Sequence, residues 1–452
     1  MWPLRTIFYF CFFWVGCVVS VVNPVWGVVN YLIAYQTHPP STWWGKPLVD
    51  LGVRFSMLAI GFTVVGLFFG RRHVPKTRPA VSFWEVGVIL LVLIGALNIL
   101  LGVGFDDSAK FAFEKFWKLQ VFVLILARLA TTRANLLLVL WTIVGGSLYL
   151  GWEAFTAPLW RFTLGRLDTF GGSDISTSSG AAAHLAGMLP LACVAFLIAR
   201  HWGWKLLAAL SAVFSFNAII LCRTRSAFLG LLAGAVVALL MAPRMRRFRV
   251  YAVLVVGGAL GFRLTDVNYW NRMETLTDKA ALDADPAVTG RADLWEASSR
   301  ILRDHPTGVG LGNFTNVIGH YDARYWRRSP HNTIIMCFCE LGVVGGAVFL
   351  TLLAGSLYLL YRAARLAHLS ERPLETSLLA YGMLVSLVVY FVAALGTERF
   401  SCESFWWVLV FPLCLYRVTT REAFGFAEAP AEDPLGETVE HGVPIRSPAQ
   451  GA

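Results

Sequence analysis

Long apolar runs recur along the whole chain and are separated by short polar segments. An α-helix needs about 20 apolar residues to cross a bilayer. Runs near this length lie at 51–70, 84–103, 117–130, 135–152, 182–199, 204–221, 226–242, 249–262, 334–361, 376–395 and 404–417. Residues 5–36 can form one long helix kinked at Pro24 or a hairpin of two helices. The pattern predicts an all-α polytopic membrane protein with about twelve transmembrane helices.

The apolar runs divide the chain into four parts. Transmembrane helices are predicted for residues 1–262 and 331–418, and a long loop that carries short helices for residues 263–330. The last part, residues 419–452, is rich in Pro, Glu, Ala and Gly, a composition typical of disordered tails.

The composition supports a membrane environment. The chain is 57% hydrophobic and 15% charged, with a mean hydropathy of +0.61, whereas soluble domains average about 25% charged residues. A chain this apolar cannot cover its own surface with polar groups, so the lipid bilayer is its expected solvent. The formal charge of +10 is therefore interpreted as a topology signal, and no nucleic-acid partner is expected. A basic surface could also hold an anionic lipid diphosphate.

Basic residues follow alternate apolar runs. The five clusters are Arg71, Arg72, Lys76 and Arg78; Arg128 and Arg133; Arg200, His201 and Lys205; Arg244, Arg246, Arg247 and Arg249; and Arg362, Arg365 and Arg372. Lys and Arg concentrate in cytoplasmic loops, so these clusters and the tail are predicted to be cytoplasmic. The loop 263–330 then lies outside the cytoplasm. It carries nine Lys or Arg and nine Asp or Glu, and long loops cross the membrane regardless of such charges.

Arginines stand at one outer membrane boundary, in Arg223-Thr224-Arg225-Ser226 between two apolar runs. The guanidinium fork suits phosphate oxygens, so Arg223 and Arg225 are candidates for binding an anion. The alternative is that both arginines extend to the lipid interface or form a structural ion pair.

A second candidate segment lies in the long loop and begins at Gly290-Arg291. Leu294, Trp295, Ile301 and Leu302 fit one face of a short helix that Pro306 ends, and Arg291 could be a second cationic clamp. The glycines that follow, in GVGLGNF, lack the strand of a nucleotide-binding fingerprint. Glycine here fits a tight turn or a close approach to a ligand.

A third segment ends the long loop with Ser329-Pro330-His331-Asn332. Histidine is suited to accept a proton near neutral pH, so His331 is a candidate general base; the alternative is a helix cap or a backbone hydrogen bond. Asn332 is predicted to start the next helix. Glu340 is a carboxylate within a span and is expected to pair with a cation, either Arg225 or Arg291.

Metal and disulfide chemistry are not predicted. The eight cysteines mostly lie in apolar runs, and Cys337 and Cys339 lack a second pair at zinc spacing. Asp106 and Asp107 stand alone in an outer loop. No metal and no cofactor are therefore expected.

The three segments, in this order and spacing, resemble the O-antigen ligase and O-antigen polymerase superfamily. The resemblance rests on RTRSAFLGL, GRADLWEASSRILRDHPTGVGLGNF and SPHNTIIMCFCELGVVGG, and covers about residues 220–350. The N-terminal NPVWGVVNYLIAY also resembles the exosortase-associated branch of O-glycosylation ligases.

The resemblance implies a glycosyltransferase of the C type in the bacterial inner membrane, with its active site on the periplasmic side. Its donor would be an undecaprenyl-diphosphate-linked glycan, and its acceptor a hydroxyl of lipid A-core, of another lipid-linked glycan or of a protein. Arg225 and Arg291 match the diphosphate-binding arginines of the superfamily and His331 matches its essential histidine. Arg223, Asn332 and Glu340 are interpreted as supporting residues. The implied transfer inverts the anomeric carbon and needs no metal.

Two alternatives stay open. A repeat-unit polymerase would use the same donor and the same residues with a second lipid-linked glycan as acceptor. A transporter of lipid-linked sugars would also need arginines within the membrane, but it would more often show inverted repeats. One departure from the superfamily is the run Ser179–His184, where relatives often carry an Asn. The segment 171–184 is equally compatible with a substrate entrance and with an ordinary loop.

Overall fold

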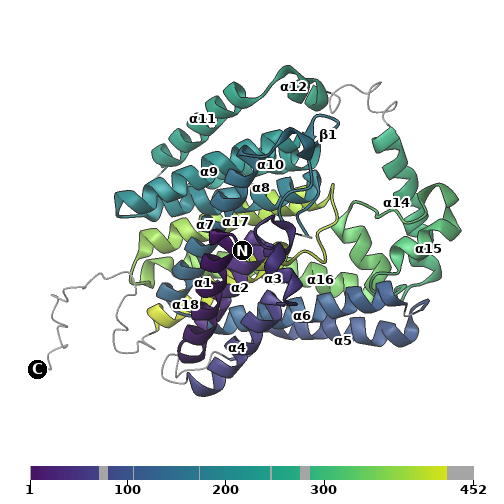
Figure 1. The fold of residues 1–452 in the computed structure, drawn as a ribbon, viewed down its shortest axis with the longest axis horizontal. Coiled ribbons are helices and arrows are strands. Elements are labelled where there is room, and N and C mark those ends of the chain that lie inside the picture. The colour runs from purple at the N-terminus through teal and green to yellow at the C-terminus, as the bar shows by residue number, and fades with distance from the viewer. Residues whose placement is uncertain are drawn as a thin grey trace, which may run out of the picture.

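The described part of the chain folds into a bundle of helices with one short β-hairpin (Figure 1). The computed structural model describes residues 2–70, 80–104, 106–172, 174–244, 247–274 and 286–424. The helices of the bundle are α1 (Leu4–Val22), α2 (Val25–Thr37), α4 (Phe55–Phe69), α5 (Phe83–Leu101), α6 (Asp107–Leu129), α7 (Arg133–Phe155), α8 (Ser178–Ile198), α9 (Trp202–Cys222), α10 (Arg225–Met241), α11 (Arg247–Leu264), α16 (Thr333–Leu366), α17 (Pro373–Ala394) and α18 (Glu403–Ala423).

Shorter elements connect these helices. They are η1 (Pro39–Ser41), α3 (Lys46–Asp50), η2 (Leu159–Arg161), the antiparallel strands β1 (Phe162–Thr163) and β2 (Arg166–Leu167), α12 (Val267–Glu274), α14 (Pro286–Asp304), α15 (Phe314–Tyr321), η4 (Ala323–Tyr325) and η5 (Ala367–Leu369).

Seven helices of the described chain are long and apolar enough to cross a membrane. They are α1, α5, α7, α8, α9, α16 together with η5, and α17, while α4 and α10 are apolar but shorter. The chain is therefore an all-α, multi-pass membrane protein. The eleven apolar runs listed above each fall on a helix, but the total of about twelve crossings stays a prediction, because α6, α11 and α18 carry more charge and α2 is short.

Residues 5–36 form the hairpin rather than the single kinked helix. α1 ends at Val22 and α2 begins at Val25, with Pro24 at the turn. The hydroxyl of Thr37 at the end of α2 donates to the Tyr9 hydroxyl near the start of α1 at 3.4 Å. The two helices therefore run antiparallel.

The bundle has two polar ends, which we call the loop end and the tail end. The loop end carries α12, α14, α15 and the β-hairpin; in Figure 1, α14 and α15 lie on the right and α12 and β1 at the top. The tail end is defined by the start of α7, the start of α17 and the end of α18. α18 links the two ends, because Glu403 at its start accepts a hydrogen bond from Tyr31 at 2.7 Å and Glu422 near its finish pairs with Arg133 at 2.6 Å.

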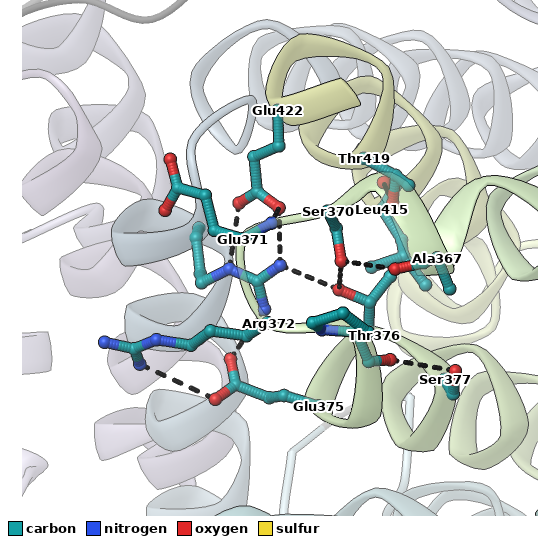
Figure 2. Close-up of polar contacts among 12 residues, drawn as sticks. Ala367, Ser370, Glu371, Arg372, Glu375, Thr376, Ser377, Leu415, Thr419 and Glu422 are labelled. Atoms are coloured by element: carbon teal, nitrogen blue, oxygen red, sulfur yellow. Dashed lines mark hydrogen bonds and ion pairs between the residues drawn. The ribbon is translucent and has the colours of Figure 1, made fainter. Parts of the chain in front are cut away.

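Carboxylates surround a nearly buried arginine at the tail end. Arg133 pairs with Glu422 at 2.6 Å and with Glu375 at 2.7 Å, and it donates to the Thr376 hydroxyl at 2.7 Å. Figure 2 shows Glu422, Glu375 and Thr376 converging from α18 and α17. This network ties three helices together. The helix α18 runs to Ala423, past residue 418 where the helical part was predicted to end.

A second cluster of oppositely charged side chains lies at the same end. Glu85 near the start of α5 is buried and pairs with Arg417 of α18 and with Arg128 of α6, both at 2.6 Å. Arg417 also donates to the backbone carbonyl of Ala127 at 2.8 Å. Burying these charges is tolerated because each has an opposite partner.

Candidate functional site

The predicted site segments meet where α14 docks against the first half of α16. Leu294, Ala297 and Ile301 of α14 are buried in a core shared with Met336 and Cys339 of α16. Ile301 and Leu294 were predicted on the packing face. This core fixes α14 onto the bundle rather than leaving it free at the surface.

An indole hydrogen bond joins the same helix to the end of the long loop. Trp295 of α14 donates from Nε1 to the backbone carbonyl of Pro330 at 2.9 Å. Pro330 precedes His331, so α14, which carries Arg291, holds the backbone beside the predicted histidine.

The glycines after α14 form the tight loop that their spacing suggested. Gly308, Gly310 and Gly312 all have positive φ, at 94°, 94° and 78°. A Cβ at Gly308 would lie 2.5 Å from the Glu340 carbonyl oxygen. Only glycine combines this backbone conformation with this close approach.

The glycine loop packs against a break in α16. Gly342 has φ 73° and interrupts the helix. The backbone N–H of Gly310 donates to the Glu340 carbonyl at 3.0 Å, and that of Val343 donates to the Pro306 carbonyl at 2.9 Å. The loop therefore satisfies backbone groups that the break would otherwise leave unpaired within the bundle.

Glu340 has a different partner from the one predicted. Its side chain is buried, and Oε1 accepts a hydrogen bond from the backbone N–H of Gly312 at 2.8 Å. The structure shows an acceptor for the glycine loop where an ion pair with Arg225 or Arg291 was expected. The prediction failed because the sequence does not reveal that the loop folds back and brings its N–H groups to this carboxylate.

His331 lies at the start of α16 in a backbone conformation unusual for a residue with a side chain. Its φ is 51°, in the left-handed region that costs energy for residues other than glycine. The backbone N–H of His331 donates to the Ser329 hydroxyl at 3.2 Å. Asn332 then caps α16, accepting from the N–H groups of Ile334 at 2.9 Å and Ile335 at 3.2 Å. The prediction that Asn332 starts this helix is confirmed.

Three arginines act on the His331 ring. Partial desolvation lowers the pKa of His331 below its usual range, and the positive charges of Arg291, Arg328 and Arg399 lower it further. The structure thus brings Arg291 and His331 together from segments 40 positions apart in the sequence. An imidazole in this surrounding is held in its neutral form, which can accept a proton.

Arg223 and Arg225 lie at the junction of α9 and α10. Arg223 has φ 47° and pairs with Asp266, just before α12. Arg225 is the first residue of α10. Its neighbour Ser226 packs so closely on Gly396 that a Cβ there would lie 2.6 Å from the serine Cβ. Arg225 therefore stands beside the segment 395–402, which joins α17 to α18 and contains Arg399.

A buried polar cluster behind His331 was not predicted. Asp174 pairs with Lys115 of α6 and accepts from the Tyr35 hydroxyl at 3.2 Å. Its backbone carbonyl accepts from Arg399 Nη1 at 2.6 Å. Glu398, Arg399 and Glu403, three charges in one short connection between two apolar runs, were the sequence signal that could have drawn attention to this place.

His331 and Arg291 thus lie close to Arg328 and Arg399, next to the core that α14 and α16 share. These elements belong largely to one stretch of the chain. Residues 210–350 match the O-antigen ligase family. The match confirms the resemblance that the three motifs carry and indicates a ligase or polymerase enzyme of glycan biosynthesis. None of the curated proteins matches the chain.

The O-antigen ligase match spans both halves of the candidate site. It includes α10 with Arg225, α14 with Arg291 and the start of α16 with His331. It ends before the segment 395–402 and starts after Lys115 and Asp174, so the buried cluster behind His331 comes from outside the matched residues. The family implies lipid-linked glycan substrates and a membrane environment.

Proposed function

We propose that this protein transfers a glycan from undecaprenyl diphosphate to an acceptor hydroxyl on the periplasmic face of the inner membrane, as an O-antigen ligase. The observation that carries the proposal is the docking of α14 on α16, which brings Arg291 close enough to act on His331 within the residues matched to the family. A cation beside a neutral imidazole suits a reaction that needs both an anion-binding group and a base.

The reaction requires one bond to form and one to break at the anomeric carbon of the donor sugar. The acceptor oxygen attacks that carbon while the bond to the diphosphate oxygen breaks, and the electron pair leaves with undecaprenyl diphosphate. His331 accepts the proton of the attacking hydroxyl. Attack opposite to the leaving group inverts the anomeric configuration.

The arginines act on the leaving group. Negative charge grows on the diphosphate oxygens as the sugar departs, and fixed guanidinium groups stabilise that charge without reorganising. We assign this role to Arg291 and Arg225. Arg223 supports them from the same junction, with part of its charge already engaged by Asp266.

Purified protein in lipid nanodiscs with a defined lipid-linked donor tests the proposal. We expect the complete protein to transfer the glycan to an added lipid A-core acceptor, and His331→Ala to bind the donor with transfer nearly abolished. Movement of donor lipid across a vesicle membrane without any new glycosidic bond would identify a transporter instead and contradict the proposal.

The same preparation separates a ligase from a polymerase. Given only undecaprenyl-diphosphate repeat units, a ligase leaves them as single units until its acceptor is supplied. A ladder of longer lipid-linked chains formed without another acceptor would identify a polymerase. The acceptor must enter beside the donor, and we place it at the two largest outer segments, 153–181 and 263–330.

The proposed orientation of the chain in the membrane has its own test. Single cysteines in α14 and after Ala423 are labelled with a membrane-impermeant maleimide on intact cells. We expect labelling in α14 only. Labelling after Ala423 but not in α14 would reverse the orientation.

A further inference from the structure

Arg399 is a buried arginine whose charge acts on the candidate base His331, although it lies outside the residues matched to the O-antigen ligase family. Arg399 is 9% exposed and lies in the segment 395–402. Its guanidinium donates from Nη1 to the backbone carbonyl of Asp174, a neutral partner, at 2.6 Å. Its Nε has no hydrogen-bond partner in the described parts of the chain. A buried cation is costly when its charge is incompletely compensated, so such a residue is expected to have a role other than packing.

The backbone of Arg399 is joined to the helix that begins beside His331. The Arg399 N–H donates to the hydroxyl of Thr333 at 2.8 Å, and that hydroxyl donates to the Thr397 carbonyl at 3.2 Å. Thr333 is the first residue of α16, two positions after His331. These two bonds fix the segment 395–402 to the backbone that carries the histidine.

The guanidinium is also held on its other side. A Cβ at Gly180, near the start of α8, would lie 2.9 Å from Arg399 Nη1, so glycine leaves the space that the arginine fills. Asp174, whose carbonyl receives the guanidinium, is itself held by Lys115 and Tyr35. The positive charge therefore has a fixed position rather than the mobility of a surface arginine.

We infer that Arg399 is a positioning residue of the transfer site, whose backbone holds the start of α16 beside His331 and whose buried guanidinium supplies a fixed positive charge there. The inference rests on the proposed role of His331 as the base. It assigns a function to a residue outside the matched stretch and explains why a cation is buried beside the site without a carboxylate receiving its Nη1.

The other charges near His331 act in the same direction or are engaged elsewhere. Arg291 of α14 and Arg328 of the same loop also lower the pKa of His331. Of the carboxylates on these segments, Asp293 lies 3.3 Å from Arg324, and Glu398, which accepts from the Ser401 N–H at 3.3 Å, contributes negative charge beside Arg399. Partial desolvation, Arg291 and Arg328 each lower the pKa of His331 more than Arg399 does, but Arg399 differs from the other two arginines because it is buried and its position is fixed.

The test measures the protonation of His331 without using transfer activity. Diethyl pyrocarbonate modifies neutral imidazole, so its rate at His331 across pH, read by peptide mass spectrometry, gives a titration midpoint. We expect Arg399→Gln to raise this midpoint by roughly half a pH unit or more, toward the ordinary histidine value. Arg399→Lys, which keeps the charge, should change it less.

Two further variants separate charge from position. Thr333→Val removes the backbone link but no charge, so it should slow transfer with the midpoint unchanged. Arg372→Gln removes an arginine at the tail end and is the matched control, for which neither quantity should change. If Arg399→Gln does not accumulate, Arg399→Met removes the same charge with an apolar side chain of similar length.

An unchanged midpoint in folded Arg399→Gln or Arg399→Met protein overturns the inference. Full transfer by His331→Ala would instead contradict the proposed function, and the modification midpoints would still decide whether Arg399 sets the protonation of His331. When both proposals hold, the acid limb of the transfer rate moves to higher pH together with the midpoint.

Discussion

The two ends of the bundle arrange their arginines differently. At the tail end, Arg133 and Arg417 each meet carboxylates at 2.6 Å. At the loop end, the charged groups that act on His331 are the three arginines Arg291, Arg328 and Arg399. Matched charges hold helices together, whereas positive charges gathered around one histidine favour an anionic ligand beside a neutral base. Ion pairs such as Arg223–Asp266 and Lys115–Asp174 also occur near the site, so the gathering of positive charge at one histidine is what distinguishes it from the tail end.

The largest expected effect is at the histidine. His331→Ala should lower the transfer rate by about 10²–10⁴-fold, the usual contribution of a general base. Initial rates with saturating donor measure this loss, and donor binding should fall little. If donor binding is lost in parallel with the rate, His331 belongs to the diphosphate site and the division of roles is different.

The arginines of the loop end should follow. Arg291→Ala and Arg225→Ala should each cost roughly 10²–10³-fold in rate, comparable to removing one preorganised donor from a site of developing charge. Lysine at either position should restore only part of the rate, because it lacks the planar fork. Turnover at the level of the unmodified protein in both alanine variants would exclude them as the clamp.

At the tail end, a substitution should lower the stability of the fold and leave the transfer rate nearly unchanged. Arg133→Met leaves Glu375 and Glu422 without their shared partner and should destabilise the fold by roughly 3 kcal/mol. Thermal unfolding in detergent measures the loss, while the transfer rate per folded molecule should be nearly unchanged. A large loss of rate with normal stability would mean that the ends are not functionally separate.

The smallest expected effect is at Asn332, the N-cap of α16. Asn332→Ala removes the side chain that accepts from Ile334 and Ile335, which should cost about 1 kcal/mol of stability. Asn332→Ser is the matched variant and should recover most of it. Because the cap adjoins His331, we expect a several-fold drop in rate, well short of the loss from His331→Ala.

Much of the bundle could be predicted because apolar runs encode helices directly. The run 135–152 lies within α7 and the run 226–242 nearly coincides with α10. Asn332 was predicted to start its helix because capping is a local property. These features depend on neighbours in sequence, so the sequence alone is sufficient to place them.

The interior of the site depends on distant contacts and was not predicted. Asp174 meets Lys115 across 59 positions and Arg399 across 225. The charges Glu398, Arg399 and Glu403 mark this connection in the sequence, but no local motif shows which distant residues they meet. The partner of Glu340 was predicted incorrectly for the same reason, since the glycine loop reaches it only after the chain folds back.

The contact between the glycine loop and the break in α16 limits how parts of this protein can be exchanged with those of relatives. A Cβ at Gly342 would lie 2.3 Å from the Thr307 carbonyl carbon, and one at Gly308 would lie 2.5 Å from the Gly342 nitrogen. Backbone therefore rests on backbone, with no side chain that could adapt to a new neighbour. A chimera that takes the glycine loop from a relative must also take the first half of α16 through Gly342, and the effect of the exchange on acceptor preference can be tested only with this larger unit.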